Sequence, residues 1–283
     1  MNMARTTLIS ATELTALRDA GGPLVIVDTR FDLAEVGAGQ QSWRGAHVPG
    51  SHYLHLDEHL CGPKSGRNGR HPLPRRADFA RTLGRLGITP QTQVVTLDAQ
   101  GGIYAARLWW MLRWMGHSTV AVLDGGIQAW TQAGGVLDNT DPGTAEAPPY
   151  PERAGLAPSI DGNALRDRLG SVRLIDARAL ERFRGDVEPL DAAAGHIPGA
   201  SNRFFKDNLD AHGRFKPAAR LRDEFAGLLG GQAATEVVHQ CGSGVTACHN
   251  LLAMEHAGLT GSVLYPGSWS EWSSDPTRPI AIG

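Results

Sequence analysis

The amino-acid sequence presents the same series of motifs twice. Three elements recur in one order, an Asp-x-Arg pair after an apolar run, a His-x-Pro-Gly turn and a closing segment with Gly and Trp, at residues 28–30, 47–50 and 125–130 and again at residues 176–178, 196–199 and 267–272. Such order-preserving similarity indicates two copies of one domain, and it excludes a solenoid of many small units.

A proline-rich stretch separates the two copies. Residues 139–155 contain Pro142, Pro148, Pro149 and Pro151, a density typical of a semi-rigid linker. We therefore expect a first domain at residues 1–138, a linker at 139–155 and a second domain at 156–283.

Within each half, short runs of β-branched residues alternate with longer helical stretches. Most of these runs are apolar at consecutive positions, as strands buried on both faces must be. We expect strands at 24–27, 94–97, 120–123, 173–175, 236–240 and 262–265, and helices at 12–19, 104–115 and 246–257. This alternation predicts an α/β fold in which each half forms a parallel sheet with helices on both faces.

Composition limits the class of protein. The 283 residues are 41% apolar, and the net charge is −2 with no basic run and no acidic tail. We therefore expect neither nucleic-acid nor membrane binding. The chain has 3 cysteines and no Cys-x-x-Cys pair, which disfavours a disulfide framework or a zinc site and fits a reducing cytoplasm.

Cys241 is the candidate nucleophile. It follows a predicted strand and opens a Gly-Ser-Gly turn that leads into a predicted helix. Converging backbone N–H groups and the helix dipole favour the thiolate, which is the reactive form of cysteine. A buried structural cysteine is the alternative, but a packed core does not need a Gly-Ser-Gly turn after the cysteine. The first half has Asp98 at the matching position, so we expect thiol chemistry only in the second half.

Residues that occur in both halves are expected to build the fold and to take no part in the chemistry. They are Asp28 and Arg30, Asp176 and Arg178, and the two histidines His47 and His196.

The loop and its flanking motifs resemble those of a known family. The Asp-x-Arg and His-Ile-Pro-Gly-Ala elements, the Cys-Gly-Ser-Gly-Val-Thr-Ala loop at 241–247 and the Gly-Ser-Trp-Ser-Glu-Trp segment are similar to those of two-domain rhodanese-type sulfurtransferases over essentially the full length. The loop resembles that of 3-mercaptopyruvate sulfurtransferases. Thiosulfate sulfurtransferases more often carry Arg and Lys directly after the cysteine.

The resemblance implies two tandem rhodanese-like domains and a persulfide intermediate on Cys241. Sulfur would pass from 3-mercaptopyruvate to a thiol, a dithiol protein or cyanide, with no metal or cofactor. Backbone N–H groups of the loop would hold the persulfide anion, those of Gly242, Gly244, Val245, Thr246 and Ala247. Because the two positions after Cys241 are neutral, the loop suits a donor with one carboxylate better than the dianion thiosulfate.

Arg182 is the candidate clamp for the donor carboxylate. The matching family stretch places a substrate-binding Arg here, and a guanidinium group can bind a carboxylate through two hydrogen bonds. A solvated surface Arg is the alternative. Mercaptopyruvate enzymes often carry a second Arg nine residues later, where this chain has Asp191. Arg184 and Arg203 are candidate replacements.

Three polar residues match family positions that form a proton relay. Asp57 and His71 lie in the first half of the sequence, and Ser243 lies in the cysteine loop. His71 would move a proton as the donor's sulfur leaves. The alternatives are a surface-loop histidine and a serine that merely tolerates the turn. The stretch 64–70 lacks the ending of a phosphate-binding loop and is interpreted as mobile and solvated.

Other functions remain as alternatives. A cysteine phosphatase needs an Arg at the end of the loop, where this chain has Ala247. A thiosulfate:cyanide sulfurtransferase and a non-catalytic persulfide carrier would each use the same cysteine loop.

Overall fold

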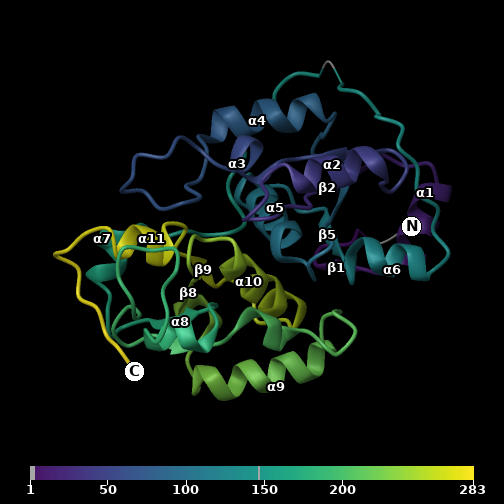
Figure 1. Ribbon diagram of the computed structural model, residues 1–283. Helices are drawn as coiled ribbons and strands as arrows, with labels where there is room; N and C mark the ends of the chain where they lie inside the picture. The colour runs from purple at the N-terminus through teal and green to yellow at the C-terminus, as the bar shows by residue number, and fades with distance from the viewer. Residues whose placement is uncertain (1–3, 146) are drawn as a thin grey trace. The chain divides into compact units, whose positions relative to one another are not determined.

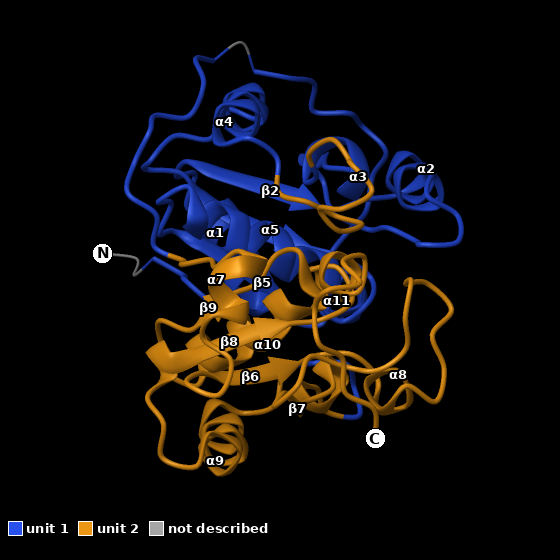
Figure 2. Cartoon of the chain, turned by 90° about the vertical axis from the view of Figure 1, so that its left-hand side faces the viewer, with its two compact units in different colours: residues 1–61, 74–156, 211–214 blue, residues 62–73, 157–210, 215–283 orange. Residues whose placement is uncertain are grey.

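The computed structural model describes residues 4–145 and 147–283, which form two compact units (Figures 1 and 2). The first unit contains the described residues up to Cys61 together with 74–156 and 211–214, and the second contains 62–73, 157–210 and 215–283. The segment 62–73 comes from the first half of the sequence and makes its contacts within the second unit. As domain boundaries, 1–138, 139–155 and 156–283 stay a prediction.

The first unit is built on a five-stranded parallel sheet. Its strands are β1 (Leu8–Ile9), β2 (Leu24–Asp28), β3 (Ser51–Tyr53), β4 (Gln93–Leu97) and β5 (Val120–Leu123), in the spatial order β1-β5-β4-β2-β3. Its helices are α1 (Ala11–Asp19), α2 (Ala38–Gly45), α3 (Leu56–His59), α4 (Arg76–Arg85), α5 (Ile103–Trp114) and α6 (Gly126–Gln132).

Helices cover both faces of this sheet. Val95 of β4 lies in one core cluster with Leu14 of α1 and Trp130 of α6. The next residue, Thr96, points to the opposite face, where its hydroxyl donates a hydrogen bond of 3.1 Å to the carbonyl of Ala105 in α5. Successive strand residues therefore pack against different helices, which explains why the strand is apolar at consecutive positions.

The second unit repeats the arrangement with four parallel strands. They are β6 (Arg173–Asp176), β7 (Ser201–Asn202), β8 (Val237–Gln240) and β9 (Val263–Leu264), in the order β7-β6-β8-β9. The helices are α7 (Gly162–Arg166), α8 (Leu180–Arg184), α9 (Ala218–Leu229), α10 (Thr246–His256) and α11 (Ser268–Trp272), with 3₁₀ turns η1 (Phe205–Asn208) and η2 (Ala234–Glu236).

The second sheet is also covered on both faces. α10 packs on β8 and β9, and the opposite face carries a core of Val238, Leu165 of α7, and Trp269 and Trp272 of α11. The predicted α/β class, with one parallel sheet and two helical layers in each half, is confirmed. Among the residues described, none of the helices combines the length and the apolar character needed to cross a bilayer.

The Asp-x-Arg pairs hold equivalent turns in the two units. Arg30 Nη2 lies 2.8 Å from Asp28 Oδ2 and donates to the carbonyl of Ala46 at 2.8 Å. Arg178 Nη2 lies 2.8 Å from Asp176 Oδ2 and donates to the carbonyl of Gly195 at 2.7 Å. Each Arg therefore fastens the end of a central strand to the residue before the His-x-Pro-Gly turn, which is the structural role expected of a repeated motif.

Candidate functional site

Cys241 lies at the carboxyl end of β8, where the chain turns into α10. Its side chain is nearly covered, with 2% of the residue exposed, and Sγ accepts a hydrogen bond of 3.2 Å from the N–H of Gly244. Gly244 has φ +77°, and a Cβ at this position would lie 2.3 Å from the carbonyl oxygen of Pro266. Glycine is therefore required for the turn that points this N–H at the sulfur.

The equivalent turn in the first unit shows what such a loop binds. Asp98 follows β4, and its buried carboxylate accepts four backbone hydrogen bonds of 2.8–3.1 Å, from the N–H groups of Gln100, Gly102, Tyr104 and Ala105. A strand–turn–helix junction of this kind is a cradle for an anion. In the first unit, the cradle is filled by the chain's own carboxylate.

The equivalent turn in the second unit carries Cys241 in place of Asp98. The positions that correspond to the four donors are Ser243, Val245, Ala247 and Cys248. Of the predicted N–H donors, Gly244 makes a direct bond to Cys241 Sγ. The predicted roles of Gly242, Val245, Thr246 and Ala247 toward an outer sulfur atom stay a prediction.

Ser268 fixes the backbone of Cys241, and no sequence pattern had assigned it a role. Its hydroxyl accepts the N–H of Cys241 at 3.1 Å and donates to the carbonyl of Tyr265 at 2.9 Å. Within the described part of the chain, Ser268 is the one residue other than glycine with positive φ, +54°. Strained backbone of this kind is concentrated at functional sites.

The repeat contains a signal that could have found Ser268. The matching residue of the first unit is Gly126, with φ +59°. In both units, the next residue donates its N–H to the carbonyl at the head of the cradle, from Ile127 to Asp98 at 3.0 Å and from Trp269 to Cys241 at 2.9 Å. Ser268 therefore stands where the backbone has a positive φ that favours glycine, and its side chain adds a hydroxyl beside Cys241.

The structure brings His71 and Ser243 together. His71 Nδ1 lies 2.7 Å from Ser243 Oγ, and both residues are buried. The segment 62–73 belongs to the same unit as the cysteine loop, so the pair forms within one unit. Asp57 lies on α3 of the first unit and is partly buried. Its place in the relay stays a prediction.

Arg182 belongs to a cluster of charged side chains beside the cysteine loop. Arg182 Nη2 lies 2.7 Å from Glu188 Oε1 and 3.0 Å from Asp191 Oδ2. Asp191 also pairs with Arg70. A Cβ on Gly242 would lie 2.9 Å from Arg70 Nη2 and 3.4 Å from Arg182 Nη1. Both guanidinium groups therefore lie directly against the residue that follows Cys241.

Arg70 corrects the interpretation of residues 64–70 as a solvated loop. Residues 64–67 are exposed, but the side chain of Arg70 is only 28% exposed. Burial and the charge of Arg182 lower the pKa of Arg70, and the nearby Cys241 acts in the opposite direction. The sequence suggested Arg184 and Arg203 in place of the family's second clamp arginine. Their surroundings differ from those of Arg70, since Arg184 is exposed and Arg203 pairs with Glu224 at 2.6 Å.

Comparison with known proteins agrees with this geometry. The family model "Rhodanese-like domain" matches residues 10–133 and 162–275. The chain belongs to the rhodanese-like family. The predicted pair of tandem rhodanese-like domains is therefore confirmed, with Cys241 in the second of them.

Relatives and solved structures extend over the full length. A probable 3-mercaptopyruvate sulfurtransferase of Pseudomonas aeruginosa is 44% identical over 99% of this chain and 100% of its own length. A putative thiosulfate sulfurtransferase of Mycobacterium tuberculosis is 38% identical over 98% of this chain and 97% of its own. The structure of 3-mercaptopyruvate sulfurtransferase from Leishmania major matches with a TM-score of 0.84 and 28% identity, over 97% of this chain and 76% of that one.

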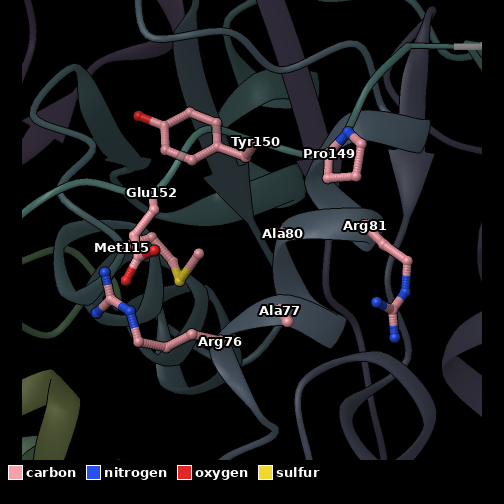
Figure 3. Close-up of a pocket in the computed structure, with 8 residues that line it drawn as sticks. All are labelled: Arg76, Ala77, Ala80, Arg81, Met115, Pro149, Tyr150 and Glu152. Carbon is pink, nitrogen blue, oxygen red and sulfur yellow. The ribbon is translucent and has the colours of Figure 1, made fainter.

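A separate hollow of about 460 Å³ lies in the first unit (Figure 3). Arg76 and Arg81 lie at two of its sides, with Met115, Pro149 and Tyr150 among the other lining residues. None of the predicted site residues lines it, so we assign no sulfur chemistry to this hollow.

Replacement of Ser268 tests its role in holding Cys241. Ser268→Ala leaves the buried N–H of Cys241 without its acceptor and keeps the strained backbone, so we expect a loss of about 1–3 kcal/mol in the free energy of unfolding. Ser268→Gly loses the same bond but releases the left-handed strain, worth about 1–2 kcal/mol. Urea unfolding should therefore place the Gly variant between the Ala variant and the wild type. Equal losses in both variants would contradict the argument.

His239 of β8 predicts an acid sensitivity in the second domain. Burial lowers the pKa of His239 from its ordinary value of 6.5 to about 3, and Nδ1 has no hydrogen-bond partner in the described structure. Below pH 6.5, the His239 side chain is therefore protonated in the unfolded chain but stays neutral in the folded domain. The stability contribution is complete above pH 6.5 and is lost progressively as the pH falls toward about 3.

The measurement is the free energy of unfolding in urea from pH 7.5 to about pH 4. His239→Leu should lose less stability over this range than the wild type, whatever its stability at neutral pH. The exposed residue His212 provides the control variant His212→Leu, for which we expect the wild-type slope. Parallel curves for the wild type and His239→Leu would refute the role of His239.

Proposed function

We propose that this protein is a sulfurtransferase that takes a sulfur atom from 3-mercaptopyruvate onto Cys241 and passes it to a thiol, a dithiol protein or cyanide. One observation carries the proposal. Cys241 stands, in the second domain, at the strand–helix turn where the first domain holds the Asp98 carboxylate on four N–H groups, and its Sγ accepts the N–H of Gly244. A thiolate or a persulfide is the anion that a cysteine supplies there.

The first half-reaction forms the persulfide. The Cys241 thiolate attacks the sulfur of the donor, an S–S bond forms and the donor's C–S bond breaks. The electron pair leaves with the carbon as the enolate of pyruvate, which takes up a proton to give pyruvate. Ser243 and His71, whose Oγ and Nδ1 lie 2.7 Å apart, move the proton from the donor's thiol in this proposal. Preorganised N–H donors stabilise the anion without a metal.

The second half-reaction releases the sulfur. An acceptor thiolate or cyanide attacks the outer sulfur of the persulfide, and the Cys241 thiolate leaves. The cradle that stabilised the persulfide also stabilises this leaving group. Because one product departs before the acceptor reacts, we expect ping-pong kinetics with a small acceptor.

The neutral residues after Cys241 support 3-mercaptopyruvate as the donor. Gly242 and Ser243 bring no positive charge to the sulfur, whereas a dianion such as thiosulfate gains most from cations placed there. Thiosulfate is the second candidate donor, favoured by the name of the relative from Mycobacterium tuberculosis. A non-catalytic persulfide carrier would use the same cradle but would not turn over.

We place the protein in the cytoplasm as part of this proposal. In the described part of the chain, Cys61, Cys241 and Cys248 form no disulfide bond, which suits a reducing compartment. A thiol nucleophile also needs such a compartment to stay reduced between turnovers.

Intact-mass analysis tests the persulfide directly. After incubation with 3-mercaptopyruvate, the protein should gain one sulfur atom, and cyanide should remove it with formation of thiocyanate. Cys241→Ser should gain none, whereas Cys248→Ser, which changes a buried residue of α10, should gain one like the wild type. A Cys241→Ser variant that keeps its activity, or a wild type that takes sulfur only from thiosulfate, would overturn the proposal.

Removal of the imidazole tests the relay. His71→Ala should lower the rate of persulfide formation from 3-mercaptopyruvate by roughly a hundredfold, since positioned acid–base groups contribute about this much. Its pH–rate profile should differ from that of the wild type. Ser243→Ala combined with His71→Ala should be no slower than either variant alone. A His71→Ala profile identical to that of the wild type would remove His71 from the mechanism, and Asp57→Asn tests Asp57 in the same assay.

A further inference from the structure

Exposed apolar side chains in the second unit are confined to two segments. Among the residues described there, the large apolar side chains that face solvent lie at the start of α8, in the loop that follows it, and at residues 280–282. They are Leu180, Val187, Leu190, Ile280 and Ile282, and we call this set the apolar rim. Apolar side chains that gather on one part of a surface mark a site of interaction more often than those scattered singly.

The two segments that carry the apolar rim lie side by side. The N–H of Gly283 donates to the carbonyl of Arg184 in α8 at 3.0 Å. His196 and Ala281 exchange two backbone hydrogen bonds of 2.8 and 2.9 Å. Figures 1 and 2 both show the C-terminal end of the chain beside α8. The rim therefore occupies neighbouring parts of one surface.

The loop after α8 reverses the usual pattern of burial. Val187 and Leu190 are 49% and 50% exposed, whereas the side chains of Glu188 and Asp191 are only 4% and 2% exposed. Both carboxylates are held inward by Arg182, at 2.7 and 3.0 Å. Acidic residues are ordinarily the exposed ones and apolar residues the buried ones. The ion pairs therefore leave the apolar side chains of this loop toward solvent.

Two contacts connect the same loop to the residues around the nucleophile. The indole N–H of Trp269 donates to the carbonyl of Ala193 at 2.8 Å, and the backbone N–H of Trp269 donates to the carbonyl of Cys241 at 2.9 Å. Arg182 Nη1 lies 3.4 Å from the position that a Cβ on Gly242 would take. The loop that carries Val187 and Leu190 is therefore fastened directly to the backbone that holds Cys241.

The size of the apolar rim and the burial of Cys241 indicate the kind of partner. A stable interface buries about 800 Å² on each partner and involves roughly 20 to 30 residues a side. Five side chains are too few for a permanent dimer and suit a partner that leaves after each encounter. Because Cys241 is buried, a folded acceptor must place its surface against the cysteine loop before its thiol can reach the sulfur. Cyanide and small thiols need no such surface.

We propose that the apolar rim docks the protein acceptor of the sulfur atom, a folded protein whose dithiol lies in an apolar surface. This inference rests on the proposed sulfurtransferase function and assigns its acceptor-binding surface. In the docked complex, a thiolate of the partner attacks the outer sulfur of the persulfide, and the S–S bond breaks with its electron pair on Cys241. The partner's second thiol then displaces the transferred sulfur as hydrogen sulfide. The partner is thereby oxidised to a disulfide, and the sulfur is reduced.

The experiment compares reduced thioredoxin, a protein dithiol, with dithiothreitol, a small dithiol of the same chemistry. Hydrogen sulfide release is measured at a fixed concentration of 3-mercaptopyruvate. In a ping-pong reaction, kcat/KM for the acceptor reports the second half-reaction alone. Val187→Ser combined with Leu190→Ser should lower kcat/KM for thioredoxin roughly three- to tenfold, mainly through KM, because two apolar contacts are lost. For dithiothreitol, kcat/KM should stay within about twofold of the wild type.

The first unit offers a matched control. Val136 and Leu137 are the same two residue types and are also exposed. Val136→Ser combined with Leu137→Ser should keep the wild-type ratio of kcat/KM for the two acceptors. Turnover with dithiothreitol also establishes that each double variant is folded. An equal fall for both acceptors in the Val187 and Leu190 variant, or a wild-type ratio, would overturn the role of the apolar rim.

A second copy of this chain is the competing occupant. Sedimentation should give the wild type and the Val187 and Leu190 variant the same mass. A wild-type dimer that these substitutions dissociate, with the acceptor ratio unchanged, would assign the rim to self-association and refute the docking proposal.

The wild type separates this inference from the function beneath it. If it transfers sulfur to neither dithiothreitol nor cyanide, the proposed function fails. If it serves both small acceptors but not thioredoxin, or if the rim variant keeps the wild-type ratio, only the docking surface fails.

Discussion

Backbone N–H groups at the junction of a central strand and the following helix are the interaction on which the rest of the site depends. Parallel strands end at a common edge of the sheet, and the helix that follows begins with N–H groups that have no partner within it. A tight turn directs these groups at one point. In the first domain, that point holds a carboxylate, and in the second it holds the sulfur of Cys241.

The duplication provides a comparison within one molecule. Features common to both domains, such as the pairs Asp28–Arg30 and Asp176–Arg178, serve the fold because they fasten equivalent turns. Features that differ lie at the cysteine loop. Asp98 fills its own turn in the first domain, and Cys241 takes its place in the second. Gly126 of the first domain corresponds to Ser268 in the second, where the hydroxyl accepts the N–H of Cys241.

Local patterns in the sequence were sufficient for the class of fold and for the position of Cys241 between a strand and a helix. Fully buried strands such as β4 are apolar at consecutive positions, and the Gly-Ser-Gly turn after Cys241 identifies a loop that must curl tightly. Short elements such as β1 and β7 were missed, because 2 residues carry no periodic signal. Their pairing depends on neighbouring strands that only the folded sheet supplies.

Arg70 could not be found from the sequence for a different physical reason. It lies in a glycine-rich, basic stretch whose first residues are solvated, and such a stretch has the composition of a surface loop. Its burial depends on Ser270 and Asp191, which lie more than a hundred residues away. From the sequence, Asp191 was only a departure from the family pattern, and the structure shows that it pairs with Arg70.

The path of residues 62–73 limits how this protein can be divided. A fragment that starts at the linker would keep Cys241, Ser243 and Arg182. It would lack the segment 62–73, which contains Arg70 and His71. Cleavage between the sequence halves is therefore not equivalent to separation of the spatial units. Cys241 and the His71 side chain that contacts Ser243 come from opposite sides of that cut, so the contact between them requires both halves of the sequence.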